Sequence, residues 1–373
     1  MNTARKKKKP GLISGILLII NSVFLLLLLM AYLAPYVDPE ATTLFSFLGL
    51  AYPVLLLINL FFIILWILLR KRYVLLSLLA VLVGWNMLLR HFNWGSSVNN
   101  EHASIKITSY NVQNLAKNNL HIQNPDHRSR IFRFLAEEQP EILCMQEFYY
   151  RGNNTSNLFK ALKKETGLPH FFHKNYFPDS RHLNALVTFT SYPLINTGEL
   201  TTENGRIFTI YTDLLIDNDT VRVYNVHLKS VRFQQSDLDF VNDLPRQASR
   251  QEKLTEGSKS VLIKLGEAFR KRAKEASILA GHIQTSPHPV ILCGDFNDTP
   301  GSFSYEKIKG NLRDAFLEAG YGYGNTYAGK LPPIRIDFIF YDRGFTSRKF
   351  QIHTLNDLSD HYPVTTHLAP SQN

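Results

Sequence analysis

The stretch VILCGDFNDTP, residues 290–300, joins an apolar run to a cluster of polar side chains. The run Val290–Cys293 has the length and composition of a buried strand, and Gly294-Asp295-Phe296-Asn297 follows it at once. Asp295 and Asn297 are two residues apart, so an extended backbone places them on the same face. The pattern predicts a buried strand that presents a carboxylate and an amide at its carboxyl end.

The same arrangement recurs between residues 105 and 361. Apolar runs adjoin further polar side chains, namely Asn111, Glu147, His227, Asp337 and the pair Asp360-His361. One polar residue at a strand end is usually solvated or caps a helix. Because the arrangement occurs six times, we expect these side chains to form one shared site.

Period-two and short apolar runs predict strands, and two longer patterns predict helices. The runs 208–214 and 221–227 follow each other across a turn without a helix between them. This favours an α+β layered sandwich over a doubly wound parallel sheet. The predicted strands are Ile105–Tyr110, Ile142–Met145, Ala185–Thr190, Phe208–Leu214, Val221–His227, Val290–Gly294 and Ile336–Phe340, and the predicted helices are Arg128–Glu138 and Ser258–His282.

Two further groups of residues have structural interpretations. Cys144 and Cys293 each lie in an apolar run, which predicts two core thiols, not a disulfide or zinc framework. The aromatic residues 171, 172, 176 and 177 are expected in a loop, where a hydrophobic cluster is favoured over stacking on bases.

The recurring residue types suit hydrolysis of a phosphate ester. A hard cation such as Mg²⁺ or Mn²⁺ prefers oxygen ligands, which Glu147, Asp360 and the amide of Asn111 supply. Asp295 can orient or deprotonate a water while Asn297 donates to the phosphate. The imidazoles His227 and His361 can bind phosphoryl oxygens, and Asp337 is expected to pair with one histidine that the spacing does not specify.

These motifs resemble the ordered set of the endonuclease/exonuclease/phosphatase superfamily, over about residues 105–367. They are SYNVQNL, MQEF, YNVHLKS, GDFNDTP, RIDFIFYD and SDHYPV. The resemblance implies a four-layer α/β/β/α sandwich of the deoxyribonuclease type, with Glu147 as the main metal ligand, assisted by Asn111 and Asp360. It implies that Asp295 activates water, that Asn297 and His227 hold the phosphate, and that Asp337 pairs with His361.

Three apolar stretches precede residue 93, and they predict membrane spans at about 11–34, 45–69 and 74–89. The last is short for a span. The first is too long for a signal peptide, and no clean cleavage site follows it. The expected organisation is a transmembrane region over residues 1–92, a linker over 93–104 and a catalytic domain over 105–368.

Positive charge predicts the orientation. Arg5–Lys9 precede the first span and Arg70–Arg72 follow the second, whereas the loop Pro35–Thr42 carries only Asp38 and Glu40. With three spans, both basic clusters are cytoplasmic in a bacterial-type inner or plasma membrane. The catalytic domain is then extracytoplasmic; with two spans it would be cytoplasmic.

Charge does not choose the substrate. Residues 1–92 hold nine Lys/Arg and two Asp/Glu, a net +7 that leaves only +3 of the total +10 for the rest. The segment Arg246–Lys274 is locally +6 and is expected to be a solvated helix face, the alternative being contact with anionic lipid or nucleic acid.

The preferred substrate is nucleic acid, hydrolysed by an endo- or exonuclease. A phospholipid head group or a phosphoinositide is the alternative, a non-enzymatic binding module is disfavoured, and no protein partner is expected.

Overall fold

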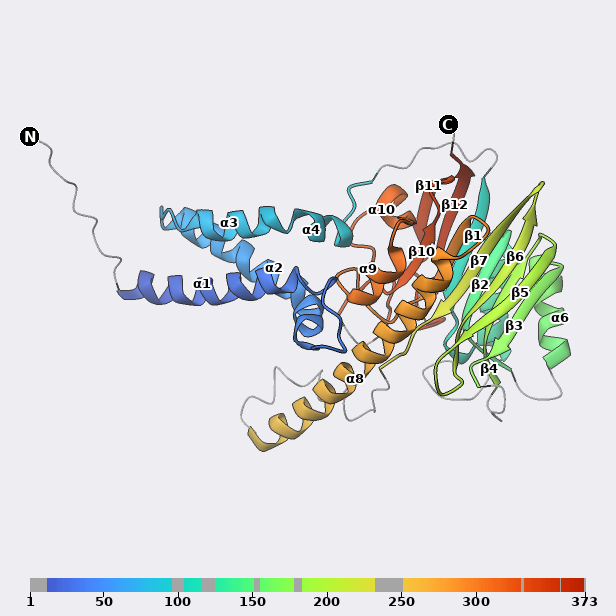
Figure 1. Cartoon of the computed structure of the whole chain (residues 1–373), viewed down its shortest axis with the longest axis horizontal. Helices are drawn as coiled ribbons and strands as arrows, with labels where there is room; N and C mark the ends of the chain where they lie inside the picture. The colour runs from blue at the N-terminus through green and yellow to red at the C-terminus, as the bar shows by residue number, and fades with distance from the viewer. Residues whose placement is uncertain are drawn as a thin grey trace, which may run out of the picture.

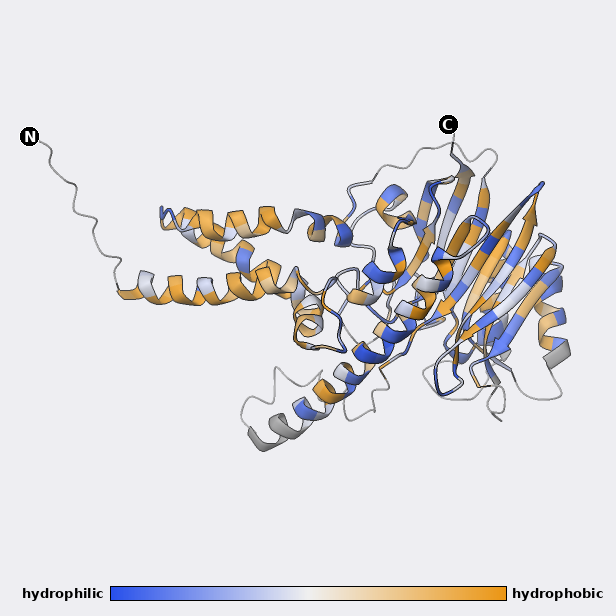
Figure 2. Ribbon diagram, in the orientation of Figure 1, coloured by the Kyte–Doolittle hydropathy of each residue, from blue (hydrophilic) through white to orange (hydrophobic). Residues whose placement is uncertain are grey.

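Two apolar helices, α1 (Leu12–Ala31) and α2 (Leu44–Leu68), begin the part of the chain that the computed structural model describes, and each could cross a membrane (Figures 1 and 2). The described residues are 12–95, 104–115, 125–150, 155–177, 183–231, 251–329, 332–355 and 357–371. The basic cluster at residues 5–9, most of the expected linker and the first residues of the basic segment 246–274 lie outside these ranges.

The third expected span is a bent pair of helices. Helices α3 (Val74–Val83) and α4 (Trp85–His91) together pass the same length and composition test but meet at 64°. The bend lies at Gly84, where an added Cβ would be 2.0 Å from Cζ of Tyr32. The third expected span, at about 74–89, thus falls on a helix pair that bends at a glycine, where the Tyr32 ring occupies the space that a side chain would need.

A buried polar network ties these helices together. Nδ2 of Asn21 in α1 donates to Oγ of Ser77 in α3 at 2.7 Å, and Ser77 donates to Oδ1 of Asn59 in α2 at 3.1 Å. Nε1 of Trp66 donates to Oδ1 of Asn21 at 2.8 Å. All four side chains are fully buried. Since hydrogen bonds between polar side chains stabilise helix packing in lipid, the network makes α3 a member of the same bundle.

The rest of the described chain forms two sheets with flanking helices (Figure 1). One sheet has the order β11-β12-β1-β2-β4-β3 and the other β5-β6-β7-β8-β10-β9. The strands are β1 (Ile105–Asn111), β2 (Ile142–Tyr150), β3 (His170–Asn175), β4 (Leu183–Thr190), β5 (Leu194–Thr201), β6 (Ile207–Ile216), β7 (Asp219–His227), β8 (Val290–Asp295), β9 (Arg313–Asp314), β10 (Asp337–Tyr341), β11 (Phe345–Ile352) and β12 (Val364–Pro370). The helices are η1 (Gln113–Leu115), α5 (Pro125–Glu138), α6 (Thr155–Thr166), α8 (Gln251–Gln284), α9 (Phe303–Lys309) and α10 (Ala315–Ala319).

Both sheets are mixed, which confirms the α+β sandwich. β1 pairs with β2 in parallel and β7 with β8 in parallel, while the other pairs are antiparallel. The run predicted at 142–145 continues to Tyr150, because a bulge between Met145 and Phe148 lets β2 resume its pairing with β4. Phe171 and Phe172 belong to β3, so the expectation of a loop there is wrong. β3 is an edge strand that is only partly buried along its whole length, so its composition resembles that of a loop.

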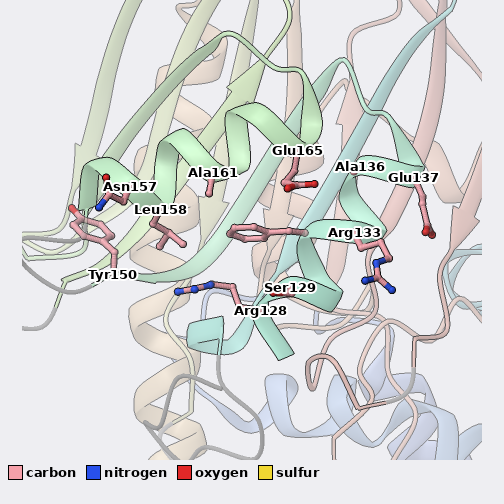
Figure 3. A pocket seen from close by; sticks show the side chains of 11 residues that line it. Arg128, Ser129, Arg133, Ala136, Glu137, Tyr150, Asn157, Leu158, Ala161 and Glu165 are labelled. Carbon is pink, nitrogen blue, oxygen red and sulfur yellow. The ribbon is translucent and has the colours of Figure 1, made fainter. Parts of the chain in front are cut away.

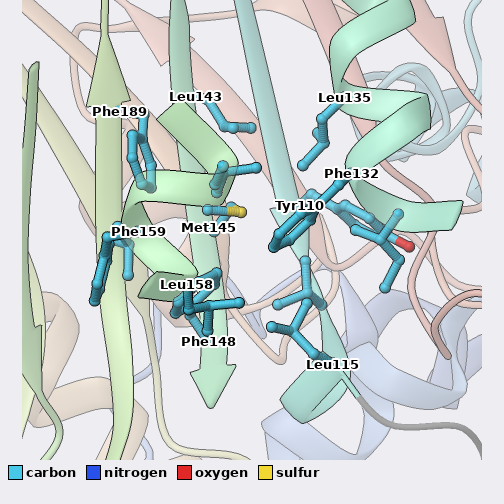
Figure 4. Close-up of a cluster of buried hydrophobic side chains, with 14 of the residues drawn as sticks. Tyr110, Leu115, Phe132, Leu135, Leu143, Met145, Phe148, Leu158, Phe159 and Phe189 are labelled. Carbon is cyan, nitrogen blue, oxygen red and sulfur yellow. The ribbon is translucent and has the colours of Figure 1, made fainter. Parts of the chain in front are cut away.

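Three apolar cores separate four layers. Residues of both sheets, including Cys144 and Cys293, form the central core, and both thiols are free and buried as predicted. Outside the first sheet, β2 and β4 pack against α5 and α6 through Phe148, Phe159 and their neighbours (Figure 4). Outside the second sheet, α8 and α9 cover β7, β8 and β10. The order is therefore helix, sheet, sheet, helix.

Candidate active site

Asp295 lies at the centre of a buried polar cluster at one end of the two sheets. It ends β8, and the strand register places His227 of β7 and Asp337 of β10 directly beside it. The preceding Gly294 has φ +154°, and a Cβ there would lie 2.0 Å from the carbonyl oxygen of Val226. Glycine therefore allows β8 to approach β7 closely enough to form this row.

The carboxylate of Asp295 accepts hydrogen bonds from both sheets. Oδ2 accepts from Nδ2 of Asn111 at 3.0 Å and from Nδ2 of Asn297 at 3.0 Å, and Oδ1 accepts from the backbone N–H of Asn297 at 2.7 Å. Asp295 is nevertheless fully buried, and this burial raises its pKa to about 7. The carboxyl group is thus balanced between its two protonation states near neutral pH.

The loop before β12 is joined to the end of β1. Oγ of Ser359 donates to the carbonyl oxygen of Asn111 at 2.7 Å and accepts from the backbone N–H of His361 at 3.1 Å. The backbone N–H of Asp360 donates to Oε1 of Gln113 at 3.1 Å. These bonds bring the residues of SDHYPV, far along the chain, to the end of the first strand.

Glu147 lies inside β2 rather than at its end. It occupies the bulge with φ +51°, which turns its side chain away from the alternation of the strand. Its backbone N–H donates to the hydroxyl of Tyr176 at 2.8 Å. Burial, and next the charge of Asp360, raises the pKa of Glu147, whereas the charge of His361 and next the amide of Asn111 act to lower it.

His227 is held as a neutral imidazole. Its Nδ1 lies 2.7 Å from the Tyr176 hydroxyl, which already accepts from Glu147 and so donates to Nδ1. We assign the ring proton to Nε2, which lies 3.6 Å from both Oε1 of Glu147 and Oδ2 of Asp295. Burial, and next the charge of Arg206, lowers the pKa of His227 well below its usual value. Among the described residues this buried Nε2 has no hydrogen-bond partner.

His361 is in the opposite state. Its Nδ1 donates to Oδ2 of Asp337 at 2.9 Å, and its Nε2 lies 3.7 Å from Oδ2 of Asp295. Burial alone would lower the pKa of His361, but Asp337 and next Asp295 raise it well above the usual value. Asp337 is itself fixed by Oγ1 of Thr326, which accepts from its backbone N–H at 3.1 Å. The site therefore contains one neutral and one cationic imidazole.

The donor set fits a hard divalent cation. The negative charge of Asp360 contributes to the raised pKa of Glu147, and a hydrogen bond with the amide of Asn111 acts in the opposite direction. Two crowded carboxylates with a neutral amide oxygen are ligands that such a cation binds. A second group, Asp295, Asp337 and His361, has ligand atoms within 4.8 Å of one another. Because His361 is bonded to Asp337 and protonated, this group suits positioning of the imidazole better than ligation.

The structure thus brings all eight predicted site residues together and adds others. Tyr176, expected in an aromatic cluster, connects Glu147 to His227. Arg206, which has no motif around it, donates to the carbonyl oxygen of His227 at 2.9 Å and pairs with Glu275 at 2.7 Å. Nothing in the sequence around Tyr176 or Arg206 indicates that they contact His227, because His227 lies more than 20 residues away from each of them in the chain.

Two cavities lie outside this cluster. One of about 890 Å³ opens between α5 and α6 in the outer helix layer, and none of the site residues lines it (Figure 3). The other, about 600 Å³, lies between α8, the turn before β6 and Glu40 of the α1–α2 loop. Its lining residues include Arg206, which bonds the carbonyl oxygen of His227, and Lys229, two residues after His227 in the chain.

The sequence profile of the Endonuclease/Exonuclease/phosphatase family matches residues 108–361, and the chain belongs to this family. It is therefore a hydrolase of the family that acts on phosphate esters. Residues 14–91 match a second profile, described as Domain of unknown function (DUF8431). No match is found among curated proteins.

Solved structures with a similar fold share little sequence. The endonuclease/exonuclease/phosphatase family protein from Leptotrichia buccalis C-1013-b is 16% identical, with 70% of this chain and 98% of that chain covered and a TM-score of 0.48. The human Nocturnin catalytic domain with bound sulfate anion is 18% identical, with 74% and 97% covered and a TM-score of 0.48. D. rerio TDP2 complexed with single strand DNA product is 17% identical, with 71% and 98% covered and a TM-score of 0.49.

Proposed function

We propose that the protein is a divalent-metal-dependent phosphodiesterase in which water attacks the phosphorus in line with the leaving oxygen. The observation that carries this proposal is the convergence on Asp295. One buried carboxylate has a neutral imidazole on one side, a cationic imidazole on the other and two amides bonded to it. Such an arrangement can move a proton and hold a dianionic transition state in the same place.

Asp295 would position the attacking water and accept its proton. The amide of Asn111 restrains one of its oxygens, and Asn297 sits beside it where its amide can also reach the phosphate. His227 would donate its Nε2–H to a phosphoryl oxygen, since Tyr176 holds the tautomer that carries the proton there. A fixed neutral donor of this kind needs no reorganisation when charge develops.

His361 would act as the cationic donor to the phosphoryl group. Asp337 orients its ring through Nδ1 and keeps it protonated, which directs Nε2–H toward Asp295 and the space beside it. Asp337 is therefore proposed as a positioning residue that acts through His361.

Glu147, Asn111 and Asp360 would hold the cation, which we propose to be Mg²⁺ or Mn²⁺. Its chemistry there would be to neutralise charge on the phosphate and the leaving oxygen. The repulsion between the two carboxylates supports this assignment, because a cation would relieve it.

As substrate, the nucleic acid phosphodiester expected from the sequence remains our first proposal. Among the similar structures, D. rerio TDP2 was solved in complex with a single strand DNA product. A phospholipid head group is the second candidate, favoured by the helices that could hold the site near a bilayer and by the cavity between α8 and the α1–α2 loop.

We further propose that residues 1–92 anchor the chain with three spans and that residues 105–368 form an extracytoplasmic catalytic domain after the linker 93–104. Arg70–Arg72, between α2 and α3, lie at the end of the bundle that points away from the sheets (Figure 1). The polar network through Ser77 supports a third span. In intact cells, a membrane-impermeant maleimide should label Asp219→Cys and not Lys71→Cys, and the reverse pattern would refute this topology.

The catalytic proposal is tested with the full chain in detergent and Mg²⁺ or Mn²⁺, offered plasmid DNA, RNA, sphingomyelin and phosphoinositides in parallel. Asp295→Asn should lower whichever activity appears by roughly 10²–10⁴-fold, the usual effect of removing a general base. Asp219→Asn, the same change at the exposed first residue of β7, is the control. Full activity of Asp295→Asn would overturn the assignment.

A further inference from the structure

Helix α8 crosses the domain-facing end of the apolar helices and is fixed there. The ring of Phe269 packs edge-on against that of Phe47 in the first turn of α2, with 5.2 Å between centroids. A Cβ on Gly266 would lie 3.9 Å from Thr43, just before α2. Nζ of Lys274 pairs with Glu40 of the α1–α2 loop at 3.1 Å. The helix therefore meets the α1–α2 loop at the level where a bilayer surface would lie.

From this crossing, the N-terminal half of α8 leaves the catalytic domain. It runs obliquely past the α1–α2 loop and away from the sheets (Figure 1). Leu262 is 51% exposed and Ile263 is 52% exposed, so the described part of the protein does not cover these two side chains. The other exposed side chains of this part of α8 are charged, namely Lys259, Glu267, Arg270 and Lys271, and Lys271 pairs with Glu267 at 3.6 Å.

Apolar side chains next to a basic face are the composition of a helix that lies in a membrane interface. The cavity of about 600 Å³ extends the same surface toward the active site. Arg270 and Lys271 line it from α8, and Arg206 and Lys229 line it from the side of His227. The lining carries charges of both signs, since Lys271 pairs with Glu267 at 3.6 Å and Arg206 pairs with Glu275 at 2.7 Å. Arg270 is the exposed cation of α8 that adds to this balance.

We propose that α8 from Lys259 to Lys271 lies in the membrane interface and binds the anionic head groups of the bilayer in which, on the proposed topology, the N-terminal helices anchor the chain. Leu262 and Ile263 enter the boundary between head groups and acyl chains. Lys259 and Arg270 contact lipid phosphates. Contact at this second point, besides the spans, sets the orientation of the catalytic cluster relative to the bilayer, whichever phosphodiester the site cleaves.

The test uses the full chain in nanodiscs of phosphatidylcholine, with or without phosphatidylglycerol. Ile263→Cys is labelled with an environment-sensitive fluorophore and exposed to lipids brominated along their chains. Ile195→Cys on β5, where the native side chain is 57% exposed, is the matched control. The native cysteines are both buried and should not react. Position 263 should be quenched at a depth of roughly 5–10 Å, and position 195 should not be quenched.

A charge-reversal variant separates the insertion of the apolar side chains from the contact with anionic head groups. Lys259→Glu with Arg270→Glu should reduce quenching at position 263 in discs with phosphatidylglycerol and change it little in phosphatidylcholine alone. Equal, weak quenching at 263 and 195 would overturn the proposal, as would protection of position 263 by single-stranded DNA independent of lipid. Adding Glu147→Gln, which changes a proposed metal ligand, should leave the quenching at position 263 unchanged. Membrane contact is therefore measured independently of whether the catalytic proposal is correct.

Discussion

The hydroxyl of Tyr176 connects the expected metal ligand to the neutral histidine, and Tyr176→Phe removes only that atom. Two hydrogen bonds are lost, one from the backbone N–H of Glu147 at 2.8 Å and one to Nδ1 of His227 at 2.7 Å. A buried group left without its partner costs about 1–3 kcal/mol. If that cost falls on the transition state, kcat/KM should fall roughly 5- to 160-fold, at 1.36 kcal/mol for each factor of ten.

Tyr224→Phe is the matched control. Its hydroxyl makes the same kind of bond, to Nδ1 of His282 at 2.7 Å, but in the outer layer between β7 and α8. Both variants should lower the thermal midpoint by a similar few degrees. Only Tyr176→Phe should lower kcat/KM and raise the Mg²⁺ concentration for half-maximal activity. Equal activity of the two variants would refute the idea that Tyr176 positions the site.

Three further outcomes are expected. Asp337→Asn should lower kcat/KM by about 10- to 160-fold, because His361 loses the charged hydrogen bond that its Nδ1 makes at 2.9 Å. This range corresponds to the roughly 1.5–3 kcal/mol that a hydrogen bond to a charged group contributes. Activity within twofold of wild type would contradict the prediction. Removal of divalent cations with a chelator should abolish activity, Mg²⁺ or Mn²⁺ should restore it, and Glu147→Gln should need more of either ion; chelator-resistant hydrolysis would argue against the proposed metal site. Asp213 accepts two hydrogen bonds from Arg222, and this pairing outweighs burial and lowers the pKa of Asp213. The pair should therefore stabilise the fold above about pH 4, and this stabilisation should be lost as the pH falls further. Thermal melts from pH 3 to 7 should therefore show a weaker acid dependence in Asp213→Asn, and an unchanged dependence would count against the pair.

Much of the fold was predictable because burial on both faces leaves a strong signal in the sequence. The strands at 105, 142, 221 and 290 are apolar runs, and each was predicted close to its observed position. The edge strands β3, β5 and β11 were not predicted, and neither were the inner strand β12 and the two-residue β9. β3, β5 and β11 are only partly buried along most of their length, so their composition resembles that of loops.

The site was predictable in its residue types and less so in its contacts. Asp337 was expected to pair with a histidine, and only its distance to His361 shows which one. Glu147 was expected at a strand end, but the strand continues and a bulge turns the residue. Tyr176 looked like one aromatic among several, because nothing near it in the sequence indicates that its hydroxyl meets His227.

The sequence by itself determined the layered sandwich, the apolar N-terminal helices and the set of carboxylates, amides and imidazoles. These follow from the order and spacing of residues, since burial and ligand chemistry depend on residue type. Only the tertiary structure decided the protonation of the two histidines, because burial and neighbouring charges set their pKa values in opposite directions. It also decided that α8 meets the start of α2, a contact between residues more than 200 positions apart.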